Sequence, residues 1–117
     1  TFARLAILHV LGAITALHDA RLVHNDIRWA NVVRKQGVHE YVLVDYDDMA
    51  MLDEQNTVPA ITWMDRDSHT PDINQNHDQK VDSWGLCKMM SEITCVHGDV
   101  SDIAEAGSKW LGQYPQL

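Results

Sequence analysis

The sequence is poor in cations, and this shortage excludes one class of partner. Nine Lys and Arg side chains stand against 17 Asp and Glu side chains among 117 residues, which gives a formal net charge of −8. Nucleic acids are bound by clustered cations that neutralise phosphates, so we expect no nucleic-acid partner. A phosphate-bearing ligand must instead be held by a metal ion or by a single placed cation.

The sequence also has little cysteine and no long hydrophobic run. Cys87 and Cys95 are its two cysteines, and in a helix they would lie about two turns apart, too far for a disulfide. No CxxC pair occurs, and His97 beside Cys95 fits no common zinc spacing. Without a run of about 18 apolar residues or a secretory leader pattern, we expect no membrane span. These absences favour a reduced, intracellular setting, the cytoplasm in particular.

Hydrophobic periodicity predicts three helices. Between residues 2 and 18, apolar side chains recur every three positions, which indicates a helix with one buried face. Residues 79–96 carry apolar side chains around much of the helical circumference, which indicates a buried helix that nevertheless contains Asp82. The segment from Ser101 predicts a short helix with Ser101 as its cap.

A β-hairpin is predicted between the first two of these helices. Two short runs of β-branched and aromatic residues, in 31–34 and 41–45, are separated by KQGVHE, whose Gly37 can adopt a positive φ. After this hairpin (31–45), residues 45–78 are polar and show little periodicity, and long irregular segments often carry binding or regulation. The fold class we expect is α+β and mainly α-helical.

The stretch VHNDIRWANVV holds a carboxylate and an amide, Asp26 and Asn31, inside apolar sequence. The predicted hairpin returns Asp45 to the point where the hairpin begins, so three oxygen-bearing side chains converge. Asn31 and Asp45 offer the hard oxygen ligands that suit Mg²⁺, while Asp26 can orient a hydroxyl group and accept its proton. Arg28 supplies a cation for the transferred phosphoryl group. Together these are the parts of a phosphoryl-transfer site.

The motif LHDARLVHNDIRWANVV followed by YVLVDYD resembles the catalytic loop and the metal-binding motif of the protein kinase superfamily. His24, Asp26 and Asn31 match the pattern His-x-Asp-x-x-x-x-Asn. The resemblance implies that Asp26 is the catalytic base, that Asn31 and Asp45 bind Mg²⁺ and the nucleotide, and that His24 is structural. The motif spelling is similar to that of atypical kinase-like domains of fungi and oomycetes.

Two further motifs follow in the order that kinases have them. HTPDI resembles a weak Ala-Pro-Glu motif, and KVDSWGLCKMM resembles the buried helix written Asp-x-Trp-Ser-x-Gly. Asp82 would then accept hydrogen bonds from backbone amides of the catalytic loop, which explains a carboxylate in an apolar helix. The resemblance implies one partial kinase-like domain, the C-terminal lobe without the N-terminal lobe, over 1–117: helix 2–18, catalytic loop 24–31, hairpin 31–45, activation-type segment 45–78 and buried helix 79–96.

The departures from the kinase pattern are as informative as the matches to it. Asn25 replaces the Arg that normally pairs with a phosphorylated activation loop, so we expect no control by that phosphorylation. Tyr46 and Asp47 replace the Phe and Gly of Asp-Phe-Gly, and Gly85 shifts the end of the buried-helix motif. No glycine-rich phosphate loop and no partner Lys or Glu precedes the first helix. We therefore expect this chain alone to bind nucleotide weakly and to transfer phosphate slowly or not at all.

Three functions are compatible with these motifs. The first is phosphoryl transfer from ATP, with Mg²⁺, to a Ser or Thr hydroxyl group of a protein substrate. The second is a catalytically inactive kinase-like module that binds or scaffolds a protein partner. The third is a small-molecule phosphotransferase of the aminoglycoside or choline kinase type, which the activation-segment and Asp82 motifs disfavour. The pattern assigns no role to His69 or His77.

Overall fold

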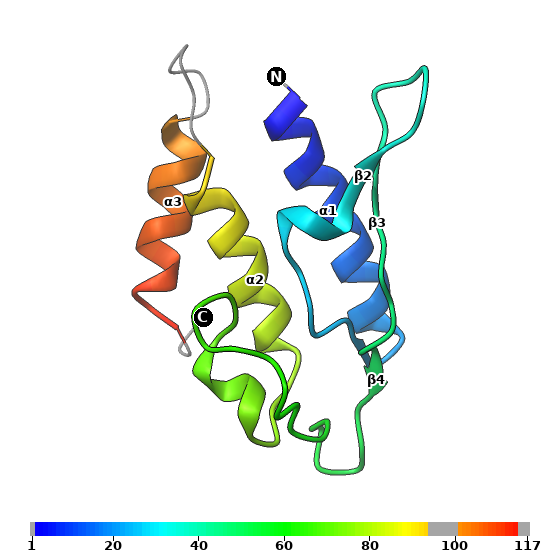
Figure 1. Ribbon diagram of the computed structural model, residues 1–117, viewed down its shortest axis with the longest axis vertical. Helices are drawn as coiled ribbons and strands as arrows, with labels where there is room; N and C mark the ends of the chain where they lie inside the picture. The colour runs from blue at the N-terminus through cyan, green and yellow to red at the C-terminus, as the bar shows by residue number, and fades with distance from the viewer. Residues whose placement is uncertain (1, 94–100, 115–117) are drawn as a thin grey trace.

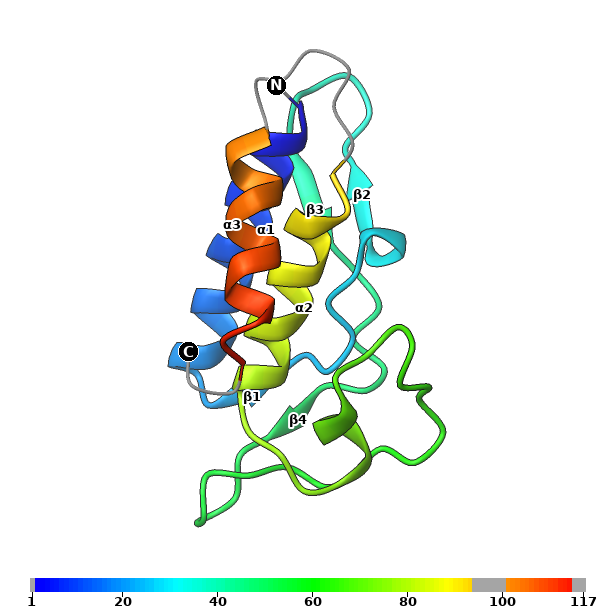
Figure 2. The same cartoon turned by 90° about the vertical axis from the view of Figure 1, so that its left-hand side faces the viewer.

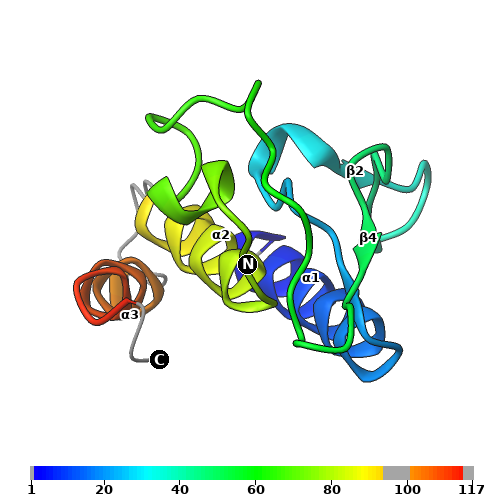
Figure 3. The ribbon, with the colours of Figure 1, turned by 90° about the horizontal axis from the view of Figure 1, so that it is seen from below.

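Three helices form a single layer with α2 in the middle. The computed structural model describes residues 2–93 and 101–114, and within them α1 is Phe2–Asp19, α2 is Lys80–Ser91 and α3 is Ser101–Leu111. Seen from below, α3, α2 and α1 follow one another in a row, and the irregular chain lies against one face of that row (Figure 3). The fold class is therefore α+β, with helices as its main elements, as the sequence predicts.

Helix α1 is built on the predicted period of three to four residues. Ala6, Ile7, Val10 and Ile14 are buried along one of its sides. The helix ends where Arg21 adopts a positive φ of 63° and its backbone N–H binds the carbonyl of His18. Among the described residues, this is the one helix that is long and apolar enough to cross a membrane, a test that core helices also pass.

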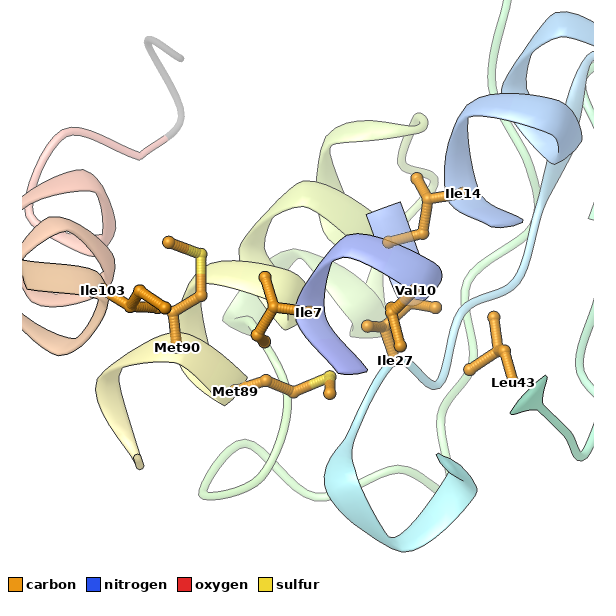
Figure 4. Packing of buried hydrophobic residues seen from close by; sticks show 8 residues of the cluster. All are labelled: Ile7, Val10, Ile14, Ile27, Leu43, Met89, Met90 and Ile103. Atoms are coloured by element: carbon orange, nitrogen blue, oxygen red, sulfur yellow. The ribbon is translucent and has the colours of Figure 1, made fainter. Parts of the chain in front are cut away.

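The main hydrophobic core joins all three helices to the loop and the hairpin (Figure 4). Fully burying a Val, Leu, Ile or Met side chain stabilises the fold by about 1.5–3 kcal/mol. Ile27 comes from the loop 24–31 and Leu43 from the hairpin, so the core holds both of these non-helical segments against α1 and α2. The eight buried members are Ile7, Val10, Ile14, Ile27, Leu43, Met89, Met90 and Ile103.

Helix α2 is shorter than the sequence predicts. We expect a helix over 79–96, but α2 ends at Ser91, and residues 94–96, with Cys95 and then His97, lie outside the described residues. At this end the Lys88 carbonyl accepts both the Ser91 hydroxyl at 2.7 Å and the backbone N–H of Glu92 at 3.1 Å. Hydrophobic periodicity does not register such a side-chain bond.

Two separate two-stranded sheets lie next to the loop 24–31 in the sequence. Strands β2 (Val32–Arg34) and β3 (Tyr41–Leu43) pair antiparallel as the predicted hairpin, with Gly37 at a φ of 81° in its turn (Figure 1). Strand β1 (Leu22–Val23) pairs antiparallel with β4 (Ala50–Met51), a contact that the sequence analysis did not predict. This second pairing ties the beginning of the segment 45–78 to the chain just before the loop 24–31.

The segment 45–78 is more ordered than its composition suggests. Besides β4 it contains the short 3₁₀ helix η2 (Pro71–Asn74) and an antiparallel bridge between Val58 and His77. Figure 2 shows it gathered at the end of the layer where α1 stops and α2 begins. A second cluster of buried apolar side chains holds it there: Val23, Val58, Ile61, Met64, Ile73 and Val81.

Gly85 of α2 allows the loop 24–31 to approach that helix closely. A Cβ at this position would lie 2.6 Å from the carbonyl oxygen of Ile27 and 2.7 Å from its Cβ. We expect Gly85→Ala to lower the free energy of unfolding by about 1–3 kcal/mol, because one backbone must move. Chemical denaturation measures this change.

A matched control for Gly85 lies on α1. A Cβ at Gly12 meets no atom within 4 Å, and alanine favours a helix over glycine by about 1 kcal/mol. We therefore expect Gly12→Ala to leave stability unchanged or to raise it. Equal stability of the Gly85→Ala variant and the wild type would show that the loop does not depend on this close approach.

Candidate functional site

Asp82 connects helix α2 to the loop 24–31. Its side chain is fully buried, and its carboxylate accepts the backbone N–H groups of His24 and Asn25 at 2.9 Å each. The ring nitrogen Nε2 of His18 lies 2.9 Å from the same carboxylate. These are the backbone bonds that the kinase resemblance implies for Asp82. The core helix thereby fixes the conformation of the two residues that precede Asp26.

His24 connects the loop to the end of strand β3. Its side chain is fully buried; Nε2 donates to the carbonyl of Val44 at 3.1 Å, and Nδ1 accepts the backbone N–H of Asp26 at 3.1 Å. The ring edge meets Tyr46, with the ring centroids 5.0 Å apart. His24 thus occupies a structural position, between the backbone of Asp26 and the residue before Asp45.

The carboxylate of Asp26 is held from two directions. The amide Nδ2 of Asn31 donates to the backbone carbonyl of Asp26 at 2.8 Å and to Oδ2 at 3.0 Å. Nε2 of His69 donates to Oδ1 at 2.8 Å. Burial alone would raise the pKa of Asp26. The hydrogen bonds from His69 and Asn31 and the positive charges of His69 and Arg28 together outweigh burial, so the pKa of Asp26 is lowered. The carboxylate is therefore ionised at neutral pH.

Asp45 returns to the neighbourhood of Asp26, as the hairpin predicts. The N–H of Val44 donates to the carbonyl of Asn31 at 2.8 Å, and Asp45 follows at a positive φ of 62°. Burial and the negative charges of Asp26, Asp45 and Asp47 raise the pKa of Asp48. Four carboxylates therefore share one electrostatic environment at this end of the hairpin.

Asn31 and Asp45 offer oxygen atoms of the chemical kind that Mg²⁺ binds. Nδ2 of Asn31 is bonded to Asp26, and its Oδ1 has no hydrogen bond among the described residues. The exposed carboxylate of Asp45 accepts one long bond, from Asp47 N–H at 3.4 Å. No three His, Cys, Asp or Glu side chains in 2–93 and 101–114 are grouped to hold a metal. A cation here would need phosphate oxygens and water to complete its shell, as Mg²⁺ commonly does.

Arg28 lies beside Asp26 at a pocket of about 270 Å³. Its guanidinium makes no hydrogen bond or ion pair with the described residues, and its charge helps to lower the pKa of Asp26. Lys88 of α2 lines the same pocket, with the anions Asp67 and Glu92. Arg28 is thus a cation that remains available to an incoming anion next to Asp26.

Three side chains that the sequence analysis left without a role complete the site. Asn25, at a φ of 77°, donates from Nδ2 to the carbonyl of Asp48 at 2.8 Å, and its Oδ1 lies 2.7 Å from Nε2 of His77. His69 binds Asp26 from the same segment. These contacts join residues 43 and 52 positions apart, and no local pattern marks them. Asn25 therefore holds the beginning and the end of the segment 45–78 with one short side chain.

Comparisons with known proteins support a kinase-like fold. No protein-family model matches the chain. Crinkler effector protein 8 of Phytophthora infestans is 32% identical over 84 residues, which represent 69% of this chain and 14% of that protein. The solved structure of the Cydia pomonella granulovirus kinase PK-1 aligns with a TM-score of 0.56 and 16% identity over 74% of this chain. This chain spans 33% of the viral chain, and the likeness concerns the fold alone.

Proposed function

We propose, from the kinase-like fold of the chain, that it forms the large-lobe part of a protein kinase-like domain. This domain transfers a phosphoryl group from ATP, with Mg²⁺, to a Ser or Thr hydroxyl group of a protein. The observation that carries the proposal is the fixed carboxylate of Asp26, bound by Asn31 at 3.0 Å beside the returning Asp45. The kinase catalytic loop needs these three groups in this relation.

Each side chain has a distinct part in the proposed reaction. Asp26 accepts a hydrogen bond from the substrate hydroxyl group and orients its oxygen towards the γ-phosphorus of ATP. It takes up the proton as the new O–P bond forms and the bond from the γ-phosphorus to the bridging oxygen breaks, which releases ADP. Its lowered pKa makes it a weak base, so orientation is its larger contribution. Arg28 stabilises the negative charge of the transferred group. Asn31 and Asp45 would hold Mg²⁺, which would supply the positive charge that neutralises the phosphate oxygens of ATP.

The proposed function is tested first at the metal ligands. We expect Asp45→Asn to weaken the apparent Mg²⁺ affinity in a transfer assay by about tenfold or more, because a charged oxygen ligand becomes neutral. The assay follows transfer of labelled γ-phosphate by the intact protein, as its cell produces it, over a Mg²⁺ titration. Asp47→Asn is the matched control, since it removes the same charge two positions away from a side chain that is not a proposed ligand, and we expect a clearly smaller change in the Mg²⁺ dependence.

The choice of acceptor separates the proposed function from its alternatives. Wild-type protein is offered Ser- and Thr-containing peptides, choline and an aminoglycoside under the same conditions. Transfer to the peptides supports the proposal, and transfer to choline or the aminoglycoside alone would identify a small-molecule phosphotransferase. Absence of transfer to every acceptor would leave the kinase-like binding module as the function of the chain.

A further inference from the structure

His69 is a buried side chain on the segment 45–78 that reaches across to the loop 24–31. Its Nε2 lies 2.8 Å from Oδ1 of Asp26, and its Nδ1 lies 3.1 Å from the backbone carbonyl of Asp65. An ionised carboxylate and a carbonyl can only accept hydrogen bonds. Both ring nitrogens must therefore donate, and the geometry describes an imidazolium that forms an ion pair with Asp26.

The same two bonds exclude His69 as a base for the reaction. A histidine that accepts a proton needs one nitrogen with a free lone pair, and here both nitrogens carry a proton that is already bonded. The carboxylate of Asp26 is held by His69 at Oδ1 and by Asn31 at Oδ2. One holder belongs to the loop itself, and the other comes from 43 residues further along the chain.

We propose that His69 is a positioning residue for the transfer reaction. It fixes the carboxylate plane of Asp26, so that Asp26 is aligned only when the segment 45–78 is folded onto the loop. This inference rests on the proposed function of Asp26. The folding of the segment 45–78 and the alignment of the proposed base are therefore coupled, because the ring of His69 connects Asp26 to Asp65.

The charge of His69 gives the positioning a pH dependence. Its hydrogen bond to Asp26 raises the pKa of His69 above the usual 6.5, against burial, and the bond to Asp65 adds to the rise while the charge of Arg28 opposes it. The side of α2 that lines its small cavity, with Val81, Trp84 and Gly85, has no titratable group. While Asp26 is ionised, the ion pair is fully formed below pH 6.5, and its positive charge and one of the two N–H donors are lost as the pH rises through the raised pKa.

The inference is tested by combining an NMR titration with kinetics on the intact protein. We expect the ring signal of His69 to titrate above pH 6.5 in the wild type, and close to 6.5 in Asp26→Asn. We expect kcat of the wild type to fall as the pH rises through the measured pKa of His69. His69→Gln should remove this alkaline fall and lower kcat at pH 6.5 by about tenfold to a hundredfold, with KM for ATP unchanged.

The control and the contrary outcomes separate this inference from the proposed function. His39→Gln changes an exposed histidine in the hairpin turn, and we expect its pH profile to match the wild type. If His69→Gln leaves the rate of transfer unchanged, or if Asp26→Asn leaves the measured pKa of His69 unchanged, the positioning role alone is overturned. Absence of transfer by the wild type at every pH would overturn the proposed function and the positioning role together, even with the NMR shift present.

Discussion

Replacing Asp26 with asparagine should reduce the rate of phosphoryl transfer by about a hundredfold to ten-thousandfold, because the variant loses both the orientation of the substrate hydroxyl group and the proton acceptor. An amide cannot take up the proton of the substrate hydroxyl group, and Asp26→Asn also breaks the ion pair with His69. The asparagine side chain has nearly the same shape as aspartate, so it can replace most of the hydrogen bonds that Asp26 makes in the loop. The measurement is kcat and KM for ATP with the intact protein, where kcat falls and KM stays within about threefold.

The matched control for Asp26→Asn is Asp19→Asn. Asp19 is an exposed carboxylate at the end of α1 and makes no hydrogen bond with the described residues. The two variants carry the same change of charge, so a shared loss of rate would reflect net charge rather than the site. A wild-type rate in Asp26→Asn would remove Asp26 from the proposed reaction.

Asp82→Ala is expected to lower the free energy of unfolding by about 3–5 kcal/mol, as the loss of a buried charged partner typically does. The backbone N–H groups of His24 and Asn25 would lose their acceptor in a place that water does not reach, and His18 would lose its partner. Whole domains are stable by only about 5–15 kcal/mol, so this single change removes a large share of the total. Urea denaturation followed by circular dichroism measures it.

Asp102→Ala is the comparison for Asp82→Ala. Asp102 forms an ion pair with Arg4 at 3.2 Å, and both side chains are exposed, at 69% and 46%. Exposed pairs of this kind contribute about 0–1 kcal/mol, so we expect little change in the midpoint of unfolding. If both variants unfold at the same urea concentration, the carboxylate of Asp82 is not the connection between α2 and the loop.

Local patterns in the sequence predict the elements that local physics determines. Helix α1 follows from a repeated apolar side, and the hairpin follows from two β-branched runs around Gly37. The spacing within the loop places Asp26 next to Asn31, and the returning strand brings Asp45 to them. A buried carboxylate at Asp82 follows from its cost, because an apolar helix tolerates such a group only when backbone donors surround it.

What the sequence did not predict depends on contacts between distant segments. Strands β1 and β4 have two residues each, too few for an alternating pattern to appear. His69 and His77 acquire their partners only when the segment 45–78 folds back onto the loop, and a histidine in a polar stretch carries no sign of this.

The bonds of Asn25 have a consequence for how the protein would be controlled in its cell. A kinase that carries Arg at this position waits for an upstream enzyme to add phosphate to its segment. Here Asn25 binds the chain at Asp48 and at His77 without any added group. Under the proposed function, such a protein would not be activated by phosphorylation of the segment 45–78. It would be able to catalyse phosphoryl transfer as soon as it folds. The total transfer activity in the cell would then be proportional to the amount of the protein. Synthesis and degradation, rather than a signalling cascade, would control that activity.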